Sequence, residues 1–349
     1  MTKRRRKTFD FAPSACHERV IKLTKQALAY DGGEVKAWQA RLRRKLRDLL
    51  GWSRMPSLRG PLHVRSVWRR PHRLGTIEKI VFTAEPGADV PAYVCLPKAE
   101  PPYTFMICLQ GHSTGMHNSI AVDRHDDTKR IRVAGDRDFA FGCMARGVAA
   151  LCIEQRSFGE RGETVQEQVS GYNMCHDAVV RAHMLGRTLI GERVFDVDRG
   201  IDYLASRGDV DMRRLGCMGN SGGGTVTMYA AAILRRIRFA MPSCSFCGYR
   251  DSIMSIYHCG CNHIPHLYEW AEMADVVGLF APRPVVVVAG RDDGIFPLRG
   301  VRSAFRDLKR IYRASGAADR CRLVVGGEGH RFYADLAWPK ALAELSRLA

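Results

Sequence analysis

The stretch of sequence that decides the fold is Leu215-Gly-Cys-Met-Gly219-Asn220-Ser221-Gly222-Gly223-Gly224. A short apolar run enters the pattern G-x-S-x-G, which leads directly into a helix-forming segment at 222–236. Glycines on either side of the serine allow a sharp turn from strand to helix, with two backbone segments close together. This turn would expose the Ser221 hydroxyl at the strand end, beside the N–H groups of the helix N-terminus. A plain glycine-rich turn has the same pattern, but the strand before it and the helix after it favour a nucleophile.

A serine nucleophile needs a histidine and an acid, and two later segments supply them. The valine-rich run at 284–289 ends in an acidic loop that contains Asp292 and Asp293. The run at 322–325 ends in a loop that contains His330. Each polar residue thus follows a run that is expected to be a buried strand. The sequence therefore predicts a catalytic triad in the order Ser, Asp, His.

Short apolar runs, bounded by glycine, proline and acidic residues, continue along most of the chain. Several consist almost wholly of Val, Ile, Leu and Cys, which is typical of strands buried on both faces of a parallel sheet. Helix-length segments separate the later runs, and this alternation predicts a doubly wound, mostly parallel α/β sheet. The first two runs adjoin without a helix and would form an antiparallel lead-in. The predicted strands are 76–82, 90–96, 105–109, 148–153, 215–218, 237–241, 284–289 and 322–325, and the predicted helices between or after them are 194–207, 222–236, 302–314 and 333–348.

The first 73 residues differ from the rest of the chain in charge. They hold 20 Lys and Arg against 5 Asp and Glu, a net charge of 20 − 5 = +15 out of +18 for the whole chain. Apolar residues within 35–50 recur at helical spacing, and Gly51 follows as a stop. We therefore expect a basic, partly helical N-terminal extension at 1–73, whose helix lies against a catalytic domain at 74–349. The positive charge would attract an anionic partner, or would belong to a solvated arm.

The overall composition excludes several classes of protein. With 349 residues, of which 46% are hydrophobic and 26% charged, the chain is globular and not disordered. No apolar run approaches the ~20 residues that span a bilayer, and no export signal follows the basic start. We therefore expect the twelve cysteines to be thiols in a cytoplasmic protein. No helix-turn-helix, zinc-finger or RNA-recognition pattern is present, so specific nucleic-acid binding is not expected.

From about residue 76 onward, roughly three quarters of the chain, the sequence resembles the α/β-hydrolase superfamily. It is most similar to the branch that holds acetylxylan-esterase-like, cephalosporin-deacetylase-like and dienelactone-hydrolase-like proteins. The resemblance implies a serine hydrolase that uses neither a metal nor an organic cofactor. The residues that carry it are Gln110-Gly111-His112, Phe158-Gly159-Glu160-Arg161, Asp198-Arg-Gly-Ile-Asp-Tyr-Leu, the Ser221 turn, Ala281-Pro-Arg-Pro, the Asp293 loop and Gly329-His330.

The resemblance also implies which aspartate completes the triad. In the superfamily pattern this residue lies three positions after a glycine and four before a proline. Counting from Gly290 and counting back from Pro297 both select Asp293. Asp292 would then be a solvent-facing neighbour or a turn cap.

For the oxyanion hole, the resemblance implies the backbone N–H groups of Gly222 and of His112. His112 lies in the loop after the run at 105–109. Many relatives have His-Gly where this chain has Gln110-Gly111, but this departure leaves the backbone donor in place. The imidazole of His112 has no role in this scheme.

A cluster of cysteine and histidine residues raises the question of a metal. Cys244 and Cys247 form a C-x-x-C pair, and His258, Cys259, Cys261, His263 and His266 follow it. Such a set can bind zinc, but the second half is C-x-C and the first half begins at the end of a buried strand. We therefore expect no metal in the catalytic site. Whether the segment 244–266 lines the pocket, through Cys244, Tyr257 or His258, or binds a metal is open at this stage.

The leading hypothesis is a carboxylic-ester hydrolase that deacetylates a small or carbohydrate-linked ester. One alternative is a peptidase of the prolyl-oligopeptidase kind, although no repeat is present that could build the usual propeller. Another is a non-catalytic protein of this fold that binds an anionic partner through its basic arm. Substrate specificity would be determined by the loops at 112–137, 157–190 and 244–275. The charged residues at 154–161 would pair with one another or with the substrate. Whether the protein forms a homo-oligomer is left open.

Overall fold

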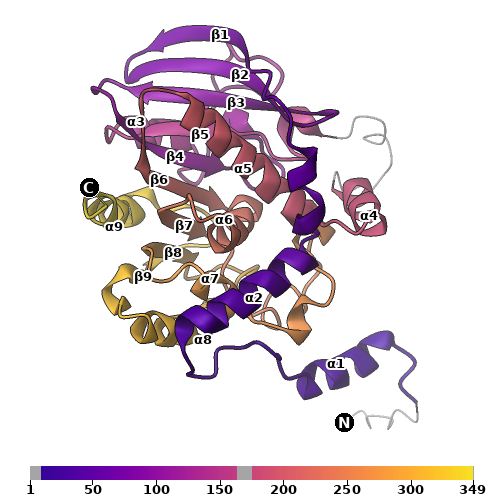
Figure 1. The fold of residues 1–349 in the computed structure, drawn as a ribbon. Helices are drawn as coiled ribbons and strands as arrows, with labels where there is room; N and C mark the ends of the chain where they lie inside the picture. The colour runs from indigo at the N-terminus through magenta and orange to yellow at the C-terminus, as the bar shows by residue number, and fades with distance from the viewer. Residues whose placement is uncertain (1–8, 163–174, 349) are drawn as a thin grey trace, which may run out of the picture.

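The computed structural model describes residues 9–162 and 175–348, and a nine-stranded sheet lies at the centre of this part (Figure 1). The strand order is β1-β2-β3-β5-β4-β6-β7-β8-β9. The first four strands in this order pair antiparallel, and every later pair is parallel. The strands are β1 (Arg65–His72), β2 (Gly75–Glu85), β3 (Ala88–Pro97), β4 (Tyr103–Leu109), β5 (Ala149–Ile153), β6 (Val210–Asn220), β7 (Phe239–Ser243), β8 (Val285–Gly290) and β9 (Cys321–Gly326).

Helices cover both faces of the sheet, so the predicted doubly wound, mostly parallel architecture is confirmed. Successive side chains of β8 alternate between two hydrophobic clusters, one on each face. The cluster that contains Trp338 packs beneath α3 and α9, and the cluster that contains Leu42 packs beneath α2 and α5 to α8. The helices are α1 (Pro13–Leu23), α2 (Val35–Leu49), α3 (Phe139–Met144), α4 (His176–Met184), α5 (Leu189–Ser206), α6 (Gly222–Ile233), α7 (Met273–Gly278), α8 (Leu298–Ala314) and α9 (Ala334–Ser346).

All eight runs that were predicted as strands are strands, and the lead-in of β2 and β3 is antiparallel as expected. The sequence analysis did not identify β1, which pairs with β2 at the edge of the sheet. Five of its first six residues are polar or exposed, so it lacks the apolar signal of a buried strand. The analysis also missed the short helices α3 and α7, which have only six residues each.

The amphipathic helix expected near the N-terminus is α2, and it packs into the domain (Figure 1). Trp38 and Leu42 are buried in the same cluster as the sheet. The amide of Gln39 donates to the carbonyl oxygens of Gly278 and Ala281. Glu34 caps the helix start by accepting two backbone N–H groups. The helix is therefore held both by apolar burial and by polar contacts, whereas α1 contains no buried residue.

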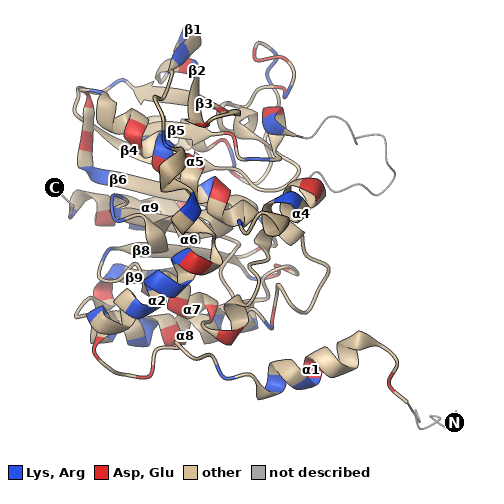
Figure 2. Ribbon diagram, turned by 45° about the vertical axis from the view of Figure 1, so that its right-hand side comes forward, with Lys and Arg blue, Asp and Glu red and all other residues tan. Residues whose placement is uncertain are grey.

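Basic side chains of the N-terminal segment also contact the domain. The Arg43 guanidinium donates to the carbonyl oxygens of Ala232 and Leu279. Arg59 forms ion pairs with Asp198 and Asp202 on α5. Figure 2 shows Lys and Arg interspersed with Asp and Glu over the ribbon. Part of the basic charge at 1–73 is thus used in internal contacts, and the functional division at residue 73 stays a prediction. In the described ranges, no helix combines the length and apolarity required to cross a membrane.

Candidate active site

Ser221 occupies the sharp turn between β6 and α6. Its backbone has φ 57° and ψ −124°, a strained conformation for a residue with a side chain. The Ser221 N–H donates to the carbonyl oxygen of Ser243 on β7 at 2.9 Å. A Cβ atom at position 223 would lie 2.0 Å from the Leu109 carbonyl oxygen, so only glycine fits there. The turn has the strand-before, helix-after geometry that the sequence predicted.

Asp293 and His330 meet across the loops that follow β8 and β9. The Nδ1 atom of His330 lies 2.8 Å from Oδ2 of Asp293. The other Asp293 oxygen, Oδ1, accepts the N–H groups of Ile295 and Phe296 at 2.8 and 3.1 Å. Burial alone would raise the pKa of Asp293, but the hydrogen bonds to His330 and to these two N–H groups outweigh it and lower the pKa. A buried, ionised aspartate therefore faces the histidine.

Asp292 points elsewhere. Its carboxylate pairs with the exposed guanidinium of Arg291 at 2.8 Å, and both side chains are more than half exposed. The Asp293 carboxylate is nearly fully buried and contacts His330. Of the two neighbouring aspartates, Asp293 is thus the one that the structure brings to the histidine.

The ring of His330 stacks on Phe296 at 6.0 Å between centroids. In the described part of the chain, no hydrogen bond joins the Ser221 hydroxyl to this ring. Contacts between a nucleophile and its base are often long before substrate binds and shorten in the complex.

The loop after β4 runs directly past Ser221. A Cβ atom at Gly111 would lie 2.9 Å from the Ser221 Cβ atom and from the Asn220 carbonyl oxygen. The ring of His112 lies against Gly222, where an added Cβ would meet its Nδ1 atom at 3.0 Å. The two residues that were predicted as oxyanion donors, His112 and Gly222, are therefore neighbours in space.

Gln110, the departure from the superfamily pattern, is buried and holds this loop. Its Nε2 atom donates to Ser119 Oγ at 2.9 Å and to the Arg137 carbonyl oxygen at 2.7 Å. Its own carbonyl oxygen accepts the side-chain amide of Gln155. Gln110 thus ties this loop to Ser119, Arg137 and Gln155.

The segment 244–266 contributes side chains to the surroundings of Asp293 and His330. The Sγ atom of Cys244 lies within 4.8 Å of the ligand atoms of Asp293 and His330. His258 packs edge-on against Phe296 at 5.7 Å, and its Nε2 atom is buried without a hydrogen-bond partner. Burial, with His112 and His263 nearby, lowers the pKa of His258 to about 4, so the ring is neutral near pH 7. Tyr257, by contrast, is 90% exposed.

The other three cysteines of this segment, Cys247, Cys259 and Cys261, lie in two different places. Cys247 donates to the carbonyl oxygen of Pro297 and joins no ligand cluster in the described residues. Cys259 and Cys261 instead lie with His112 and with Cys175, which the sequence analysis did not single out. Cys175 is far from this segment in the sequence, and no spacing rule could have identified it.

The charged residues at 154–161 pair mainly with other protein groups. Arg156 contacts Glu85, Glu192 and Asp196, and Arg161 also contacts Asp196. Glu154 is almost fully buried, and burial raises its pKa to about 7. These contacts tie β5 to α5 rather than leave the charges open to a substrate. Part of the predicted specificity loop at 157–190, residues 163–174, lies outside the described residues.

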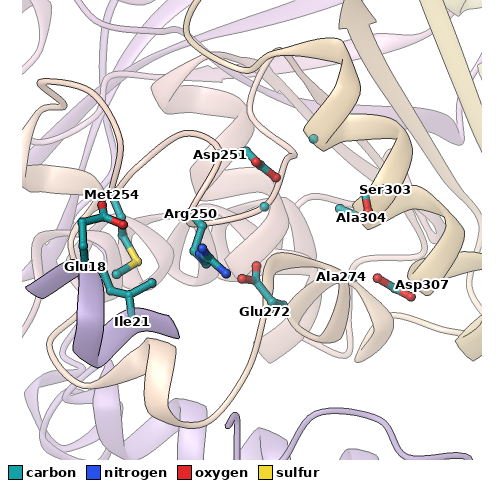
Figure 3. Close-up of a pocket in the computed structure, with 12 residues that line it drawn as sticks. Glu18, Ile21, Arg250, Asp251, Met254, Glu272, Ala274, Ser303, Ala304 and Asp307 are labelled. Atoms are coloured by element: carbon teal, nitrogen blue, oxygen red, sulfur yellow. The ribbon is translucent and has the colours of Figure 1, made fainter. Parts of the chain in front are cut away.

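A separate hollow lies beside the N-terminal helix (Figure 3). It has a volume of about 410 Å³ and is bordered by Glu18 of α1 and by Ser303 and Asp307 of α8. In Figure 3, Arg250 and Glu272, the residue that caps α7, lie between Glu18 and the two residues of α8. None of the predicted catalytic residues lines this hollow.

Comparisons with known proteins agree with this fold. The model of the prolyl oligopeptidase family matches residues 183–346. YtaP of Bacillus subtilis (strain 168), whose name calls it a hydrolase, is 24% identical over 296 residues, which are 84% of this chain and 94% of YtaP.

Two solved structures illustrate the likeness. A protein of Bacteroides fragilis NCTC 9343, whose name calls it an acetyl xylan esterase, has a TM-score of 0.75 and 15% identity, over 96% of this chain and 86% of its own. A glucuronoyl esterase from Solibacter usitatus has a TM-score of 0.65 and 15% identity, over 93% and 97% of the two chains. The chain thus has the α/β-hydrolase fold of these esterases, and its predicted likeness to acetylxylan esterases is confirmed.

Proposed function

We propose that this protein of the α/β-hydrolase fold is a carboxylic-ester hydrolase that acts through Ser221, His330 and Asp293. The observation that carries the proposal is the contact of 2.8 Å between His330 Nδ1 and Asp293 Oδ2. It occurs at the ends of β8 and β9, two strands away from the strained turn that exposes Ser221. The three residues follow parallel strands at the edge where this fold class places its sites.

The reaction runs in two halves. The Oγ atom of Ser221 attacks the ester carbonyl, while His330 Nε2 takes the hydroxyl proton and Asp293 stabilises the resulting imidazolium. The protonated ring then gives its proton to the departing alcohol, which leaves an acyl group on the serine. A water molecule, deprotonated by the same nitrogen, releases the acid and restores the serine.

Negative charge develops on the carbonyl oxygen in both halves. The N–H groups of Gly222 and His112 are the donors for this oxygen. The proximity of Gly111 to Ser221 supports this role, because it brings the loop that carries His112 beside the nucleophile. Donors that are already in place before the reaction stabilise the transition state by several kcal/mol, roughly 3 for one donor.

The substrate class is an acetyl ester of a small alcohol or a carbohydrate. Structural neighbours named as acetyl xylan esterases support this choice. The match to the prolyl oligopeptidase family keeps amide cleavage as the competing activity. In residues 9–162 and 175–348 the strands form one sheet, and no β-propeller of the kind usual in those peptidases is present. A cytoplasmic location and a homo-oligomer stay predictions.

The test compares the wild type with Ser221→Ala on p-nitrophenyl acetate, p-nitrophenyl butyrate and a proline-containing peptide p-nitroanilide. We expect turnover of the acetate ester by the wild type and a loss of about 10³-fold or more in the variant. Preference for the anilide would favour the peptidase. Equal activity of both proteins would contradict the assignment of Ser221. A protein that neither turns over esters nor reacts with a fluorophosphonate at Ser221 would instead be a non-catalytic binder, and salt-dependent retention on a polyanion would then identify its partner class.

A further inference from the structure

Four side chains of the kind that bind metals converge beneath the loop after β4. They are His112, Cys175, Cys259 and Cys261, and their ligand atoms all lie within 4.8 Å of one another. They come from three separate segments: the loop after β4, the residue before α4, and the C-x-C pair at the short helical turn Gly260–Asn262. Segments so distant in sequence bring three thiols and an imidazole together only through the tertiary fold.

Two residues of the cluster are buried, and the other two, His112 and Cys259, are partly buried. Cys175 and Cys261 are each 1% exposed, and Cys259 is partly buried. The Nε2 atom of His112 lies 2.9 Å from the Sγ atom of Cys261. Phe158 covers the imidazole in an edge-to-face contact at 4.9 Å. Water therefore has little access to Cys175 and Cys261.

A buried cation, the guanidinium of Arg193, lies beside the cluster. Arg193 is 1% exposed, and its Nη2 atom donates to Cys175 Sγ at 3.4 Å. Its other hydrogen bonds go to the Arg156 carbonyl oxygen, and its guanidinium lies 4.2 Å from the centre of the Phe158 ring. Among the residues that the structure describes, its Nη1 atom has no hydrogen-bond partner. Within the described ranges, Arg193 makes no ion pair with a carboxylate. A buried guanidinium without an anion is costly, so its partner is expected among the sulfur atoms.

We propose that His112, Cys175, Cys259 and Cys261 bind one zinc ion in a tetrahedral site. Zinc takes thiolate and imidazole ligands at about 2.3 and 2.0 Å, which sets the ligand atoms roughly 3.5 to 3.8 Å apart in a tetrahedron. The ligand atoms of the cluster, all within 4.8 Å of one another, lie near this spacing. On binding, the three thiols release their protons to solvent and His112 coordinates as a neutral ring through Nε2. Three thiolates and Zn²⁺ sum to −3 + 2 = −1, which balances the single charge of Arg193.

Four protein ligands leave no open position, so the ion is structural. The ion would affect the proposed active site by holding a loop in place. His112 belongs to the loop beside Ser221, and its ring also lies against Gly222. The ion would therefore fasten this loop to the residue before α4 and to the C-x-C turn. The proposal does not depend on the hydrolase activity, because zinc binding requires none of the triad residues.

The experiment measures zinc by mass spectrometry in full-length protein purified with reductant and without chelator. Cys259→Ser and Cys261→Ser are compared with Cys247→Ser, a buried cysteine outside the cluster, and with the exposed Cys16→Ser. We expect about one zinc per chain in the wild type and both controls, and a fall of about tenfold or more in the two cluster variants. Ser221→Ala should keep its zinc, so failure of the catalytic proposal would be distinguishable.

A measurement on the wild type alone covers the case in which the cluster variants do not fold. The zinc is removed with a chelator and replaced by Co²⁺, and tetrahedral thiolate coordination should give intense visible absorption. Wild type that holds less than about one tenth of a zinc per chain and gives no such absorption would overturn the proposal. A disulfide between any two of the three cysteines in freshly isolated protein, or equal loss of zinc in Cys247→Ser, would overturn it too.

Discussion

His330 Nδ1 lies 2.8 Å from Asp293 Oδ2, while the neighbouring Asp292 pairs with Arg291 at the surface. The chain thus offers two adjacent aspartates, of which one is buried against the histidine and the other is exposed. This difference in position makes them a matched pair for testing the acid of the triad.

Replacing Asp293 with Asn should lower kcat for p-nitrophenyl acetate by about 10³ to 10⁴-fold, because the amide no longer stabilises the imidazolium or holds the productive tautomer. Asp292→Asn, the control, should change kcat by less than about twofold, since its charge is exposed and screened. Steady-state kinetics gives kcat for both variants and for the wild type. Equal losses in the two variants would show that the acid has been assigned wrongly.

Gly111→Ala should displace the loop beside the nucleophile. The new Cβ atom would lie 2.9 Å from both the Asn220 carbonyl oxygen and the Ser221 Cβ atom, so backbone must move. A shift of this size at the oxyanion loop should cost about 10²-fold in kcat. Gly208→Ala serves as the control, because no atom lies within 4 Å of its added Cβ. Full activity in Gly111→Ala would contradict the role of this loop.

Helix α2 should contribute directly to the stability of the folded protein. Leu42 is fully buried in the main cluster, so Leu42→Ala should lower the free energy of unfolding by about 3 kcal/mol. Arg44→Ala, on the exposed side of the same helix, should change it by less than about 0.5 kcal/mol. Urea unfolding curves would measure both. An unchanged midpoint in Leu42→Ala would mean that α2 is not packed as described.

Glu154 should make stability depend on pH. Burial raises its folded-state pKa to about 7, above the ordinary value of 4.5, so the folded protein holds this proton more tightly than the unfolded chain. The stability that this proton provides is complete below pH 4.5 and is lost as pH rises through about 7. Among neighbouring charges, Glu160 raises this pKa further and Arg161 lowers it.

Glu154→Gln replaces the carboxyl group, which titrates, with an amide that does not. Between about pH 5 and pH 8, the wild type should therefore lose about 3 kcal/mol of unfolding free energy relative to the variant. Glu269→Gln, at an exposed position, is the control and should show the wild-type pH dependence. If the free energy of unfolding changed with pH in the same way in the wild type and in Glu154→Gln, the assignment of this buried proton would be refuted.

Local sequence was sufficient for most of the sheet, because buried strands need apolar runs and sharp turns need glycine. The valine run of β8 and the glycines around Ser221 carry these requirements in adjacent residues. Strand β1 could not be predicted in this way, since an edge strand with one exposed face requires few apolar residues. Short helices such as α3 are stabilised by the packing of Phe139 and its neighbours, not by their own length.

The sequence by itself thus determined the glycine turn at Ser221, the order of Ser221, Asp293 and His330, and the sheet that positions them. Each of these depends on the conformation or burial of neighbouring residues, which composition and spacing express. Only the tertiary structure decided that Cys175 joins Cys259, Cys261 and His112, that Cys247 does not, and that Arg193 lies beside them. Such contacts depend on the path of the whole chain, because helices and loops distant in sequence must pack before these side chains can meet.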